Sequence, residues 1–152
     1  MIDDVKVQLF LRNILLDFVD NVVKDGMWLY EIAGTIQPVP LLFISDNTQG
    51  HSIKDGIIIE EHFSSELASN YLDFSENTCY YHLKISDDRG TGLRLKRFVN
   101  LIKDFFSVGV YHIDDNTGLE ILDVHSASYT TEEDDTKVAI ILSVSCHVFA
   151  LT

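Results

Sequence analysis

The last stretch of the chain that resembles a strand decides the fold: KVAIILSVSCHVFAL, residues 137–151. Successive side chains of a β-strand point to opposite faces of a sheet, and this stretch alternates in that way. One face carries only apolar side chains and a cysteine, and the other mixes apolar with small polar side chains. As one strand it would be roughly 45 Å long, at about 3.3 Å per residue. We therefore predict a strand that is central in its sheet, or covered on both sides.

The residues before this strand predict a long C-terminal β-hairpin. Residues 119–124 (LEILDV) continue as residues 125–130 (HSASYT) to form the first arm. An acidic tip, TEEDDT at residues 131–136, separates it from the last strand. Upstream, residues 108–113 (VGVYHI) predict another strand, joined to the hairpin by the turn-rich DDNTG at residues 114–118. The tip carries four consecutive acids: Glu132, Glu133, Asp134 and Asp135.

Residues 91–107 predict an amphipathic helix that lies flat on the sheet. At 100° per residue its apolar side chains, Leu101 among them, fill one continuous arc of roughly 160°. Thr91 is the expected N-cap. The opposite face should be exposed and mostly basic, with Leu93 as an apolar exception. This predicted basic face consists of Arg94, Lys96, Arg97 and Lys103, together with Asn100 and Asp104.

The N-terminal part predicts a second helix and several strands. Apolar residues spaced by three and four indicate a helix over residues 2–24, and further apolar positions suggest that it is buried on more than one side. Pro38 and Pro40 should mark an edge or a crossing between strands, because proline cannot donate to a sheet ladder. Strands are predicted at residues 27–35, 40–45, 56–63 and 78–86.

Together these elements predict an α+β fold. It would consist of a mostly antiparallel sheet with two amphipathic helices and a long C-terminal β-hairpin. The length of 152 residues suits a single domain, residues 1–152, with a possible loop or arm insertion around residues 46–77.

The charge of the chain is unevenly distributed. The formal net charge is −13, from 24 acids and 11 bases. Residues 84–103 hold six of the bases and two acids, a local charge of +4, so the remainder carries −17. This acidity argues against direct binding to nucleic acid or to an anionic membrane. We expect no signal peptide and no membrane span, and the two cysteines suggest a reducing, cytoplasmic site of synthesis.

No pattern in the sequence predicts a catalytic, cofactor or metal site. The six histidines match no compact ligand spacing, and His62, His82, His112 and His147 fall on predicted strands as packing residues. We interpret the two cysteines as small core residues, because neither follows a glycine elbow or begins a helix. The stretch DDRGTGLRLK, residues 87–96, lacks the lysine and hydroxyl that follow the last glycine of a phosphate-binding loop, G-x-x-x-x-G-K-[ST].

The chain resembles the tail-terminator, or tail-completion, proteins of long-tailed bacteriophages. The likeness lies in the order of elements: an N-terminal helix (IDDVKVQLFLRNILLDFV), a strand region with PLLFIS, and a second helix (GLRLKRFVNLIKDFF) before VGVYHID. It extends to the ending LEILDVHSASYTTEEDDTKVAIILSVSCHVF. The stretch 46–77 has no clear counterpart in this pattern. The resemblance implies a non-enzymatic virion subunit, without a cofactor, made in the host cytoplasm.

The resemblance further implies a homo-oligomer, typically a hexameric ring. Such a ring caps the tail tube, stops its polymerisation and joins it to the head-completion or connector proteins of the neck. We expect a head-to-tail contact between the basic helix face and the acidic tip of a neighbouring copy, weakened by salt. Its residues would be Arg94, Lys96, Arg97 and Lys103 on one side and Glu132, Glu133, Asp134 and Asp135 on the other. The alternative is an acidic protein-binding module, such as an inhibitor or immunity-type protein that occupies a basic site on a partner.

Overall fold

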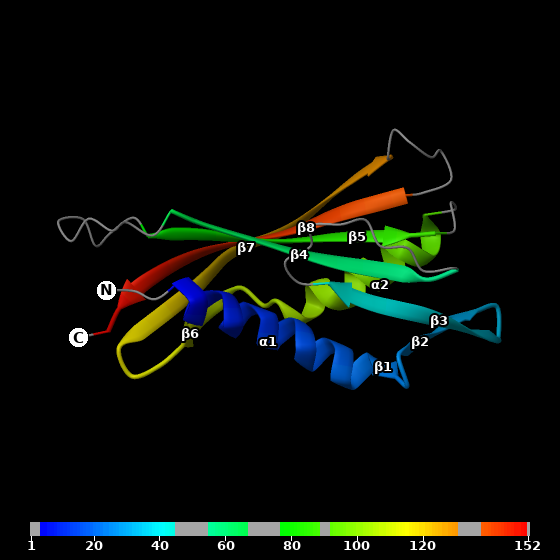
Figure 1. The fold of residues 1–152 in the computed structure, drawn as a ribbon, viewed down its shortest axis with the longest axis horizontal. Coiled ribbons are helices and arrows are strands. Elements are labelled where there is room, and N and C mark those ends of the chain that lie inside the picture. Colours follow the sequence, from blue (N-terminus) through cyan, green and yellow to red (C-terminus); the bar gives the residue numbers. More distant parts are fainter. Residues whose placement is uncertain (1–3, 45–54, 67–76, 89–91, 131–137, 152) are drawn as a thin grey trace.

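A computed structural model describes residues 4–44, 55–66, 77–88, 92–130 and 138–151. The elements found there are drawn in Figure 1. The helices are α1 (Asp4–Val22) and α2 (Leu93–Phe105). The strands are β1 (Val23–Lys24), β2 (Met27–Ile32), β3 (Thr35–Ile44), β4 (Ile57–Glu66), β5 (Thr78–Asp87), β6 (Gly109–His112), β7 (Thr117–Thr130) and β8 (Val138–Ala150).

These strands form one sheet in the order β1-β2-β3-β4-β5-β8-β7-β6. Strands β3 and β4 run parallel, and the other neighbouring pairs of the described sheet run antiparallel. The predicted α+β fold, with a mostly antiparallel sheet and two helices, is confirmed.

Strand β8 is central, as its two-faced pattern predicted. It pairs with β5 on one side and with β7 on the other. The ladder between β7 and β8 runs from Thr117 opposite Ala150 to Thr130 opposite Val138. Residues 131–137, and with them the predicted acidic tip, lie outside the described residues.

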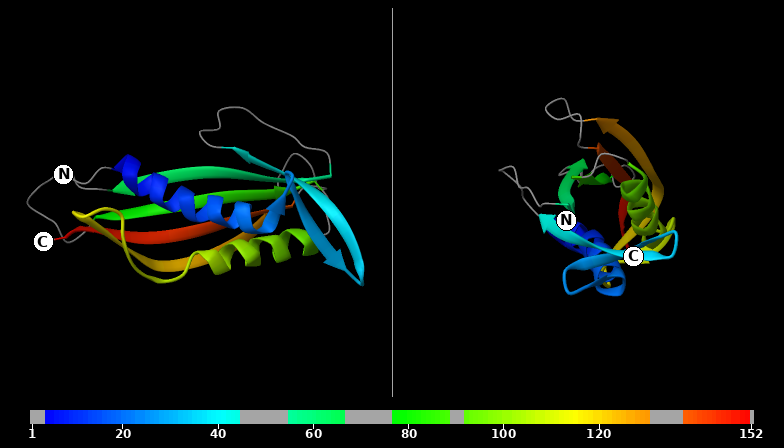
Figure 2. Two further views of the ribbon diagram at one scale, coloured as in Figure 1. Left: turned by 90° about the horizontal axis from the view of Figure 1, so that it is seen from below. Right: turned by 90° about the vertical axis from the view of Figure 1, so that its right-hand side faces the viewer.

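Both helices pack on the same face of a strongly curved sheet (Figure 2). The buried side of α1 follows the predicted spacing of four and three and consists of Val7, Leu11, Leu15 and Phe18. The ring of Phe18 lies edge-on to two rings of α2, those of Phe98 at 5.4 Å and Phe105 at 5.3 Å between centroids. These contacts join the two helices above the apolar inner face of β5 and β8.

Two predicted boundaries in the N-terminal sheet were wrong. The expected strand over residues 27–35 is broken by a turn at Ala33 and Gly34, which have φ values of 51° and 80°. The chain then returns as β3, which passes through both Pro38 and Pro40 instead of ending at them. Beyond Pro40, residues 41–44 of β3 turn to a second neighbour, β4.

Two further details differ from the expectation. The N-cap of α2 is Gly92, with φ 75°, rather than Thr91. Leu101, expected in the apolar arc, is 38% exposed.

Strand β4 confirms the strand predicted at residues 56–63. Residues 46–54 and 67–76 of the possible loop or arm insertion lie outside the described residues.

Candidate assembly surfaces

The predicted basic face of α2 is smaller than expected, because Arg94 is buried. Its side chain is 5% exposed, and its Nε donates to Asp87 Oδ2 at 2.9 Å. Its Nη2 also donates to the carbonyl oxygen of Asp55 at 3.4 Å. The prediction that Arg94 faces solvent was wrong, because Asp87 is itself buried at the end of β5 and requires a counter-ion. Arg94 therefore ties the start of α2 to the sheet.

The other three bases of α2 lie at the surface. Lys96 and Arg97 are exposed, and Lys103 is half-buried. The guanidinium of Arg97 lies over the Tyr30 ring, 5.6 Å from its centroid, and Nη1 donates to the Glu31 carbonyl oxygen at 3.2 Å. Arg97 thus holds strand β2 against the helix. Of the predicted basic face, Lys96 and Lys103 therefore remain available to another partner.

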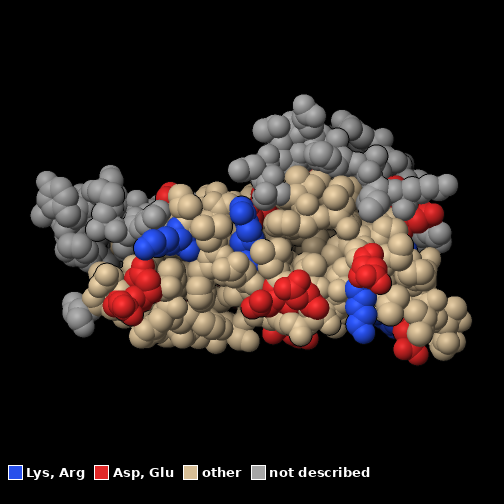
Figure 3. All heavy atoms as spheres, turned by 60° about the horizontal axis from the view of Figure 1, so that its bottom comes forward, with Lys and Arg blue, Asp and Glu red and all other residues tan. Residues whose placement is uncertain are grey.

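The predicted acidic partner of this face is the tip at residues 131–136. Glu132, Glu133, Asp134 and Asp135 lie outside the described residues. On the face turned forward in Figure 3, acidic and basic side chains are scattered in small groups over a mostly uncharged surface. That face does not gather its bases into one patch.

The hairpin of β2 and β3 has an apolar outer face. Trp28 and Tyr30 point inward, so the residues that alternate with them point outward: Met27 is 40% and Leu29 51% exposed. On β3, Ile36 is 59% exposed. The cross-strand pairs of this outward face are Met27 with Pro40, Leu29 with Pro38, and Glu31 with Ile36, so Glu31 is its one charged residue. Exposed apolar groups that adjoin one another often mark an interaction site.

A second exposed apolar stripe lies on α1. Val5, Leu9 and Leu16 are 58%, 44% and 36% exposed. The sequence predicted that this helix would be buried on more than one side, and in the single chain these three side chains remain partly exposed. They lie on a different element from the outer face of the hairpin.

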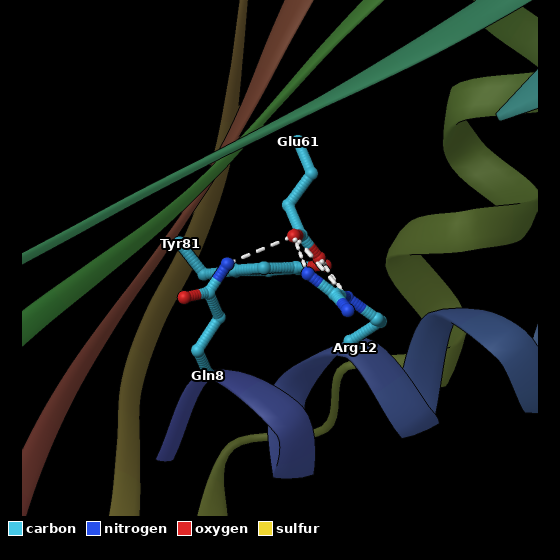
Figure 4. Close-up of polar contacts among 4 residues, drawn as sticks. All are labelled: Gln8, Arg12, Glu61 and Tyr81. Carbon is cyan, nitrogen blue, oxygen red and sulfur yellow. Dashed lines mark hydrogen bonds and ion pairs between the residues drawn. The ribbon is translucent and has the colours of Figure 1, made fainter. Parts of the chain in front are cut away.

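A buried carboxylate anchors α1 to the sheet (Figure 4). The Glu61 side chain, on β4, is fully buried and accepts hydrogen bonds from Arg12 and Gln8 of α1, and from the Tyr81 hydroxyl of β5. Arg12 Nη2 lies 2.6 Å from Glu61 Oε1, and Gln8 Nε2 lies 2.9 Å from the same oxygen. This cluster was not predicted from the sequence. A glutamate between Ile59 and Phe63 on one face of the predicted strand was the signal available.

The electrostatics of this cluster suit an anchor rather than a catalyst. Burial raises the pKa of Glu61, but the hydrogen bonds from Arg12, Tyr81 and Gln8 outweigh it, so the net pKa lies below the ordinary value. Burial and the bond to Glu61 raise the pKa of Tyr81. Glu61 therefore remains ionised and Tyr81 remains protonated at neutral pH. Each holds the other in place.

The four histidines predicted to be packing residues all lie on strands, but only two of them are partly buried. His82 of β5 and His147 of β8 are half-buried, whereas His62 of β4 and His112 of β6 are exposed, so the packing prediction was wrong for these two. His82 Nδ1 is 2.9 Å from Ser143 Oγ, and burial, with His62 and His125 nearby, lowers the pKa of His82. The described ranges contain no group of three potential metal ligands.

The two cysteines are buried free thiols, as predicted for core residues. Cys79 and Cys146 lie directly opposite each other on β5 and β8, and are 0% and 1% exposed. The hydrogen bond that the Cys146 thiol donates to Cys79 and the burial of that thiol raise the pKa of Cys146. It therefore stays protonated at neutral pH.

Comparison with known proteins does not place the chain in a family. No family model matches it, and no curated protein matches its sequence. Neither described helix is long and apolar enough to cross a bilayer.

Proposed function

We propose that this protein is a structural subunit of a bacteriophage tail, forming a ring that caps the tail tube and joins it to the head-completion proteins. The proposal combines the resemblance in element order with one observation, the exposed apolar outer face of the β2–β3 hairpin. The role is non-enzymatic and requires no cofactor. In the virion the protein would lie at the junction of tail and neck.

The apolar face supports self-assembly for an energetic reason. Met27, Leu29 and Ile36 expose about half of their surface in the single chain, and covering an apolar side chain contributes about 25 cal/mol per Å². The stripe of Val5, Leu9 and Leu16 on α1 is a different surface, so a contact between the two would be head-to-tail. Head-to-tail contacts close into a ring when the rotation between subunits permits.

The proposal includes the long C-terminal hairpin. Strands β7 and β8 pair along their lengths, and residues 131–137 would connect them as its tip. The tip would present Glu132, Glu133, Asp134 and Asp135 to Lys96 and Lys103 of the neighbouring copy. Because exposed charges are screened over about 8–10 Å at physiological salt, this part of the contact should weaken as salt is added.

Electron microscopy tests the proposed function. The purified chain in negative stain should show rings with a central opening. When it is co-expressed with the tail-tube protein encoded in the same genome, tubes should end in such a ring. Tubes that grow to the same uncontrolled length with and without the chain would contradict the capping role.

A second function is favoured by the charge of −13, which suits an acidic module that occupies a basic site on another protein. It predicts a monomer in isolation and a one-to-one complex with a basic partner. Neither state would give rings in the microscope.

A further inference from the structure

Strand β7 has a neighbour on both sides for only part of its length. Its partner β8 pairs with it from Thr117 to Thr130, with a register shift between Ile121 and Asp123. Its other partner, β6, pairs only with residues 118–121. Among the described strands, residues 122–130 therefore form an open sheet edge. Figure 1 shows this end of β7 extending away from β6 toward the end of the molecule opposite the termini.

Strand β4 has a matching open edge. It pairs with β5 along its whole length, but with β3 only through residues 57–60. Residues 61–66 therefore have one described neighbour. They lie at the end of the molecule that carries both termini (Figure 1).

The open parts of the two edges lie at opposite ends of the molecule. Strand β6 covers the part of the β7 edge nearer the termini, and β3 covers the part of the β4 edge farther from the termini. Strands β4 and β7 run antiparallel within the sheet. A second copy, placed beside the first and displaced along the strands, can therefore fit its β4 edge into the β7 recess. Neither β3 nor β6 then stands in the way, and the helices of both copies remain on the same face.

The composition of these edges leaves them open to pairing. Natural edge strands are usually blocked by lysine, proline, short length or inward charge. The two outermost strands of the described sheet follow this rule by being short, since β1 has two residues, including Lys24, and β6 has four. Residues 61–66 (EHFSSE) and 124–130 (VHSASYT) contain no proline, lysine or arginine, and residues 124–130 contain no acid. In a chain of charge −13, residues 124–130 therefore add no repulsion of their own, and in residues 61–66 the inward Glu61 carboxylate is paired with Arg12, which leaves Glu66 as the other acid.

We propose that residues 61–66 of one copy add, antiparallel, to residues 125–130 of the next copy, so that the sheet continues from subunit to subunit. The partner is thus a second copy of this chain, and the contact is head-to-tail. The inference rests on the proposed function only in requiring self-assembly, and it names the surfaces that meet.

The backbone hydrogen bonds determine the register. Val148 donates to Asn77 on the β5 side of β8, and Leu151 donates to Asn116 on the β7 side. Bonds alternate along an antiparallel ladder, so Ser126, opposite Leu142, directs its own N–H away from β8. On the other side of the sheet, the Asp88 N–H donates to the Gly56 carbonyl, so residues 56 and 88 form a hydrogen-bonded pair. By the same alternation along β4, the backbone N–H groups of residues 61, 63 and 65 point away from β5.

Of the alignments that satisfy both alternations, one pairs all of residues 61–66 with described residues of β7 and keeps β3 clear of that strand. It places residue 61 opposite residue 130, 63 opposite 128, and 65 opposite 126, each as a hydrogen-bonded pair. Ser64 then lies opposite Ala127 in a closer, non-hydrogen-bonded pair, where Cα atoms are about 4.5 Å apart. Both side chains are exposed, and both point away from the core, because they alternate with Phe63, opposite the buried Tyr81, and with Ser126, opposite the buried Leu142. This spacing suits a disulfide.

Cysteine cross-linking tests the register. A mixture of Ser64→Cys and Ala127→Cys chains, oxidised with copper phenanthroline, should give a covalent dimer on a non-reducing gel. Either variant alone should give none at this position, because each chain brings only one side of the contact. The matched control pairs Ser64→Cys with Ser126→Cys, which is exposed but faces the other side of the sheet and should not cross-link.

A proline variant tests the contact without a cross-link. Ser126→Pro removes an N–H that faces the open edge and leaves the β7–β8 ladder intact, whereas Ser126→Ala keeps that N–H. The proline variant should weaken assembly about tenfold or more relative to the alanine variant. Its unfolding temperature, measured alongside, shows whether the subunit remains folded.

The outcomes separate this contact from the proposed function. If the wild type assembles but the two pairings cross-link equally or not at all, the edge contact is wrong and the ring remains. If the Ser64–Ala127 cross-link forms but assemblies do not cap tail tubes, the contact stands and the proposed function is wrong. Equal assembly of the two folded Ser126 variants would also overturn the contact.

Discussion

Replacing Arg12 by methionine should destabilise the fold by about 3 kcal/mol. Arg12 supplies the counter-ion of the buried Glu61 carboxylate, with Nε and Nη2 both within 3.2 Å of its oxygens. Removing one partner of a buried ion pair costs about 3–5 kcal/mol, because a charge is left uncompensated. The lower end applies here, since the Arg12 side chain is 24% exposed, and Gln8 and Tyr81 still donate to Glu61.

The assay is urea unfolding of the wild type, Arg12→Met, Glu61→Met and the double variant. The double variant should be more stable than Arg12→Met alone, because no buried charge remains, with a coupling energy of at least about 1 kcal/mol. In thermal unfolding, Arg12→Met should melt about 6–12 °C below the wild type. A loss under 1 kcal/mol for Arg12→Met, or strict additivity in the double variant, would refute the idea that this cluster anchors α1.

The pH dependence of the same anchor has a definite sign. The pKa of Glu61 in the folded protein lies below its ordinary value of 4.5. Its contribution to stability is therefore fully present above about pH 4.5 and is lost as the pH falls through the lowered pKa. The free-energy difference between the wild type and Glu61→Gln should shrink below pH 4.5. A difference that stays constant down to the lowest pH at which both are folded would contradict this.

Two other substitutions have expected effects on stability. Arg94→Met should lower the free energy of unfolding in urea by about 3–5 kcal/mol, because the buried Asp87 loses its counter-ion. Its control is Lys96→Met, an exposed position on the same helix, which should change the free energy of unfolding by no more than about 0.5 kcal/mol. Similar losses for both variants would contradict the buried pair. Gly118→Ala would place its Cβ 2.5 Å from a carbon of the Phe149 ring, so it should lower stability by about 1–3 kcal/mol. A melting temperature equal to that of the wild type would mean that the ring moves aside freely.

The periodic elements could be predicted from the sequence because one residue type repeats at one spacing. The alternation of β8 and the spacing of Val7, Leu11 and Phe18 on α1 both reflect burial against a single layer. The turn at Ala33 and Gly34 was missed, because only a positive φ distinguishes it from the flanking strand residues.

The ion pairs could not be predicted from the sequence in the same way. Arg94 has the periodicity of a surface residue, and only the folded chain brings it to the buried Asp87. Glu61 likewise meets Arg12 through a contact that spans 49 residues of sequence. The open edges of β4 and β7 depend on where neighbouring strands stop, and local patterns predict such boundaries poorly.

The absolute mass of the purified chain in solution, measured by light scattering at low and high salt, tests the central claim of self-assembly most directly. One chain has a mass of 17.2 kDa. We predict a single discrete species that contains more than two chains. This species should dissociate toward smaller ones as the salt concentration rises. A species of 17.2 kDa at every protein and salt concentration would contradict the claim.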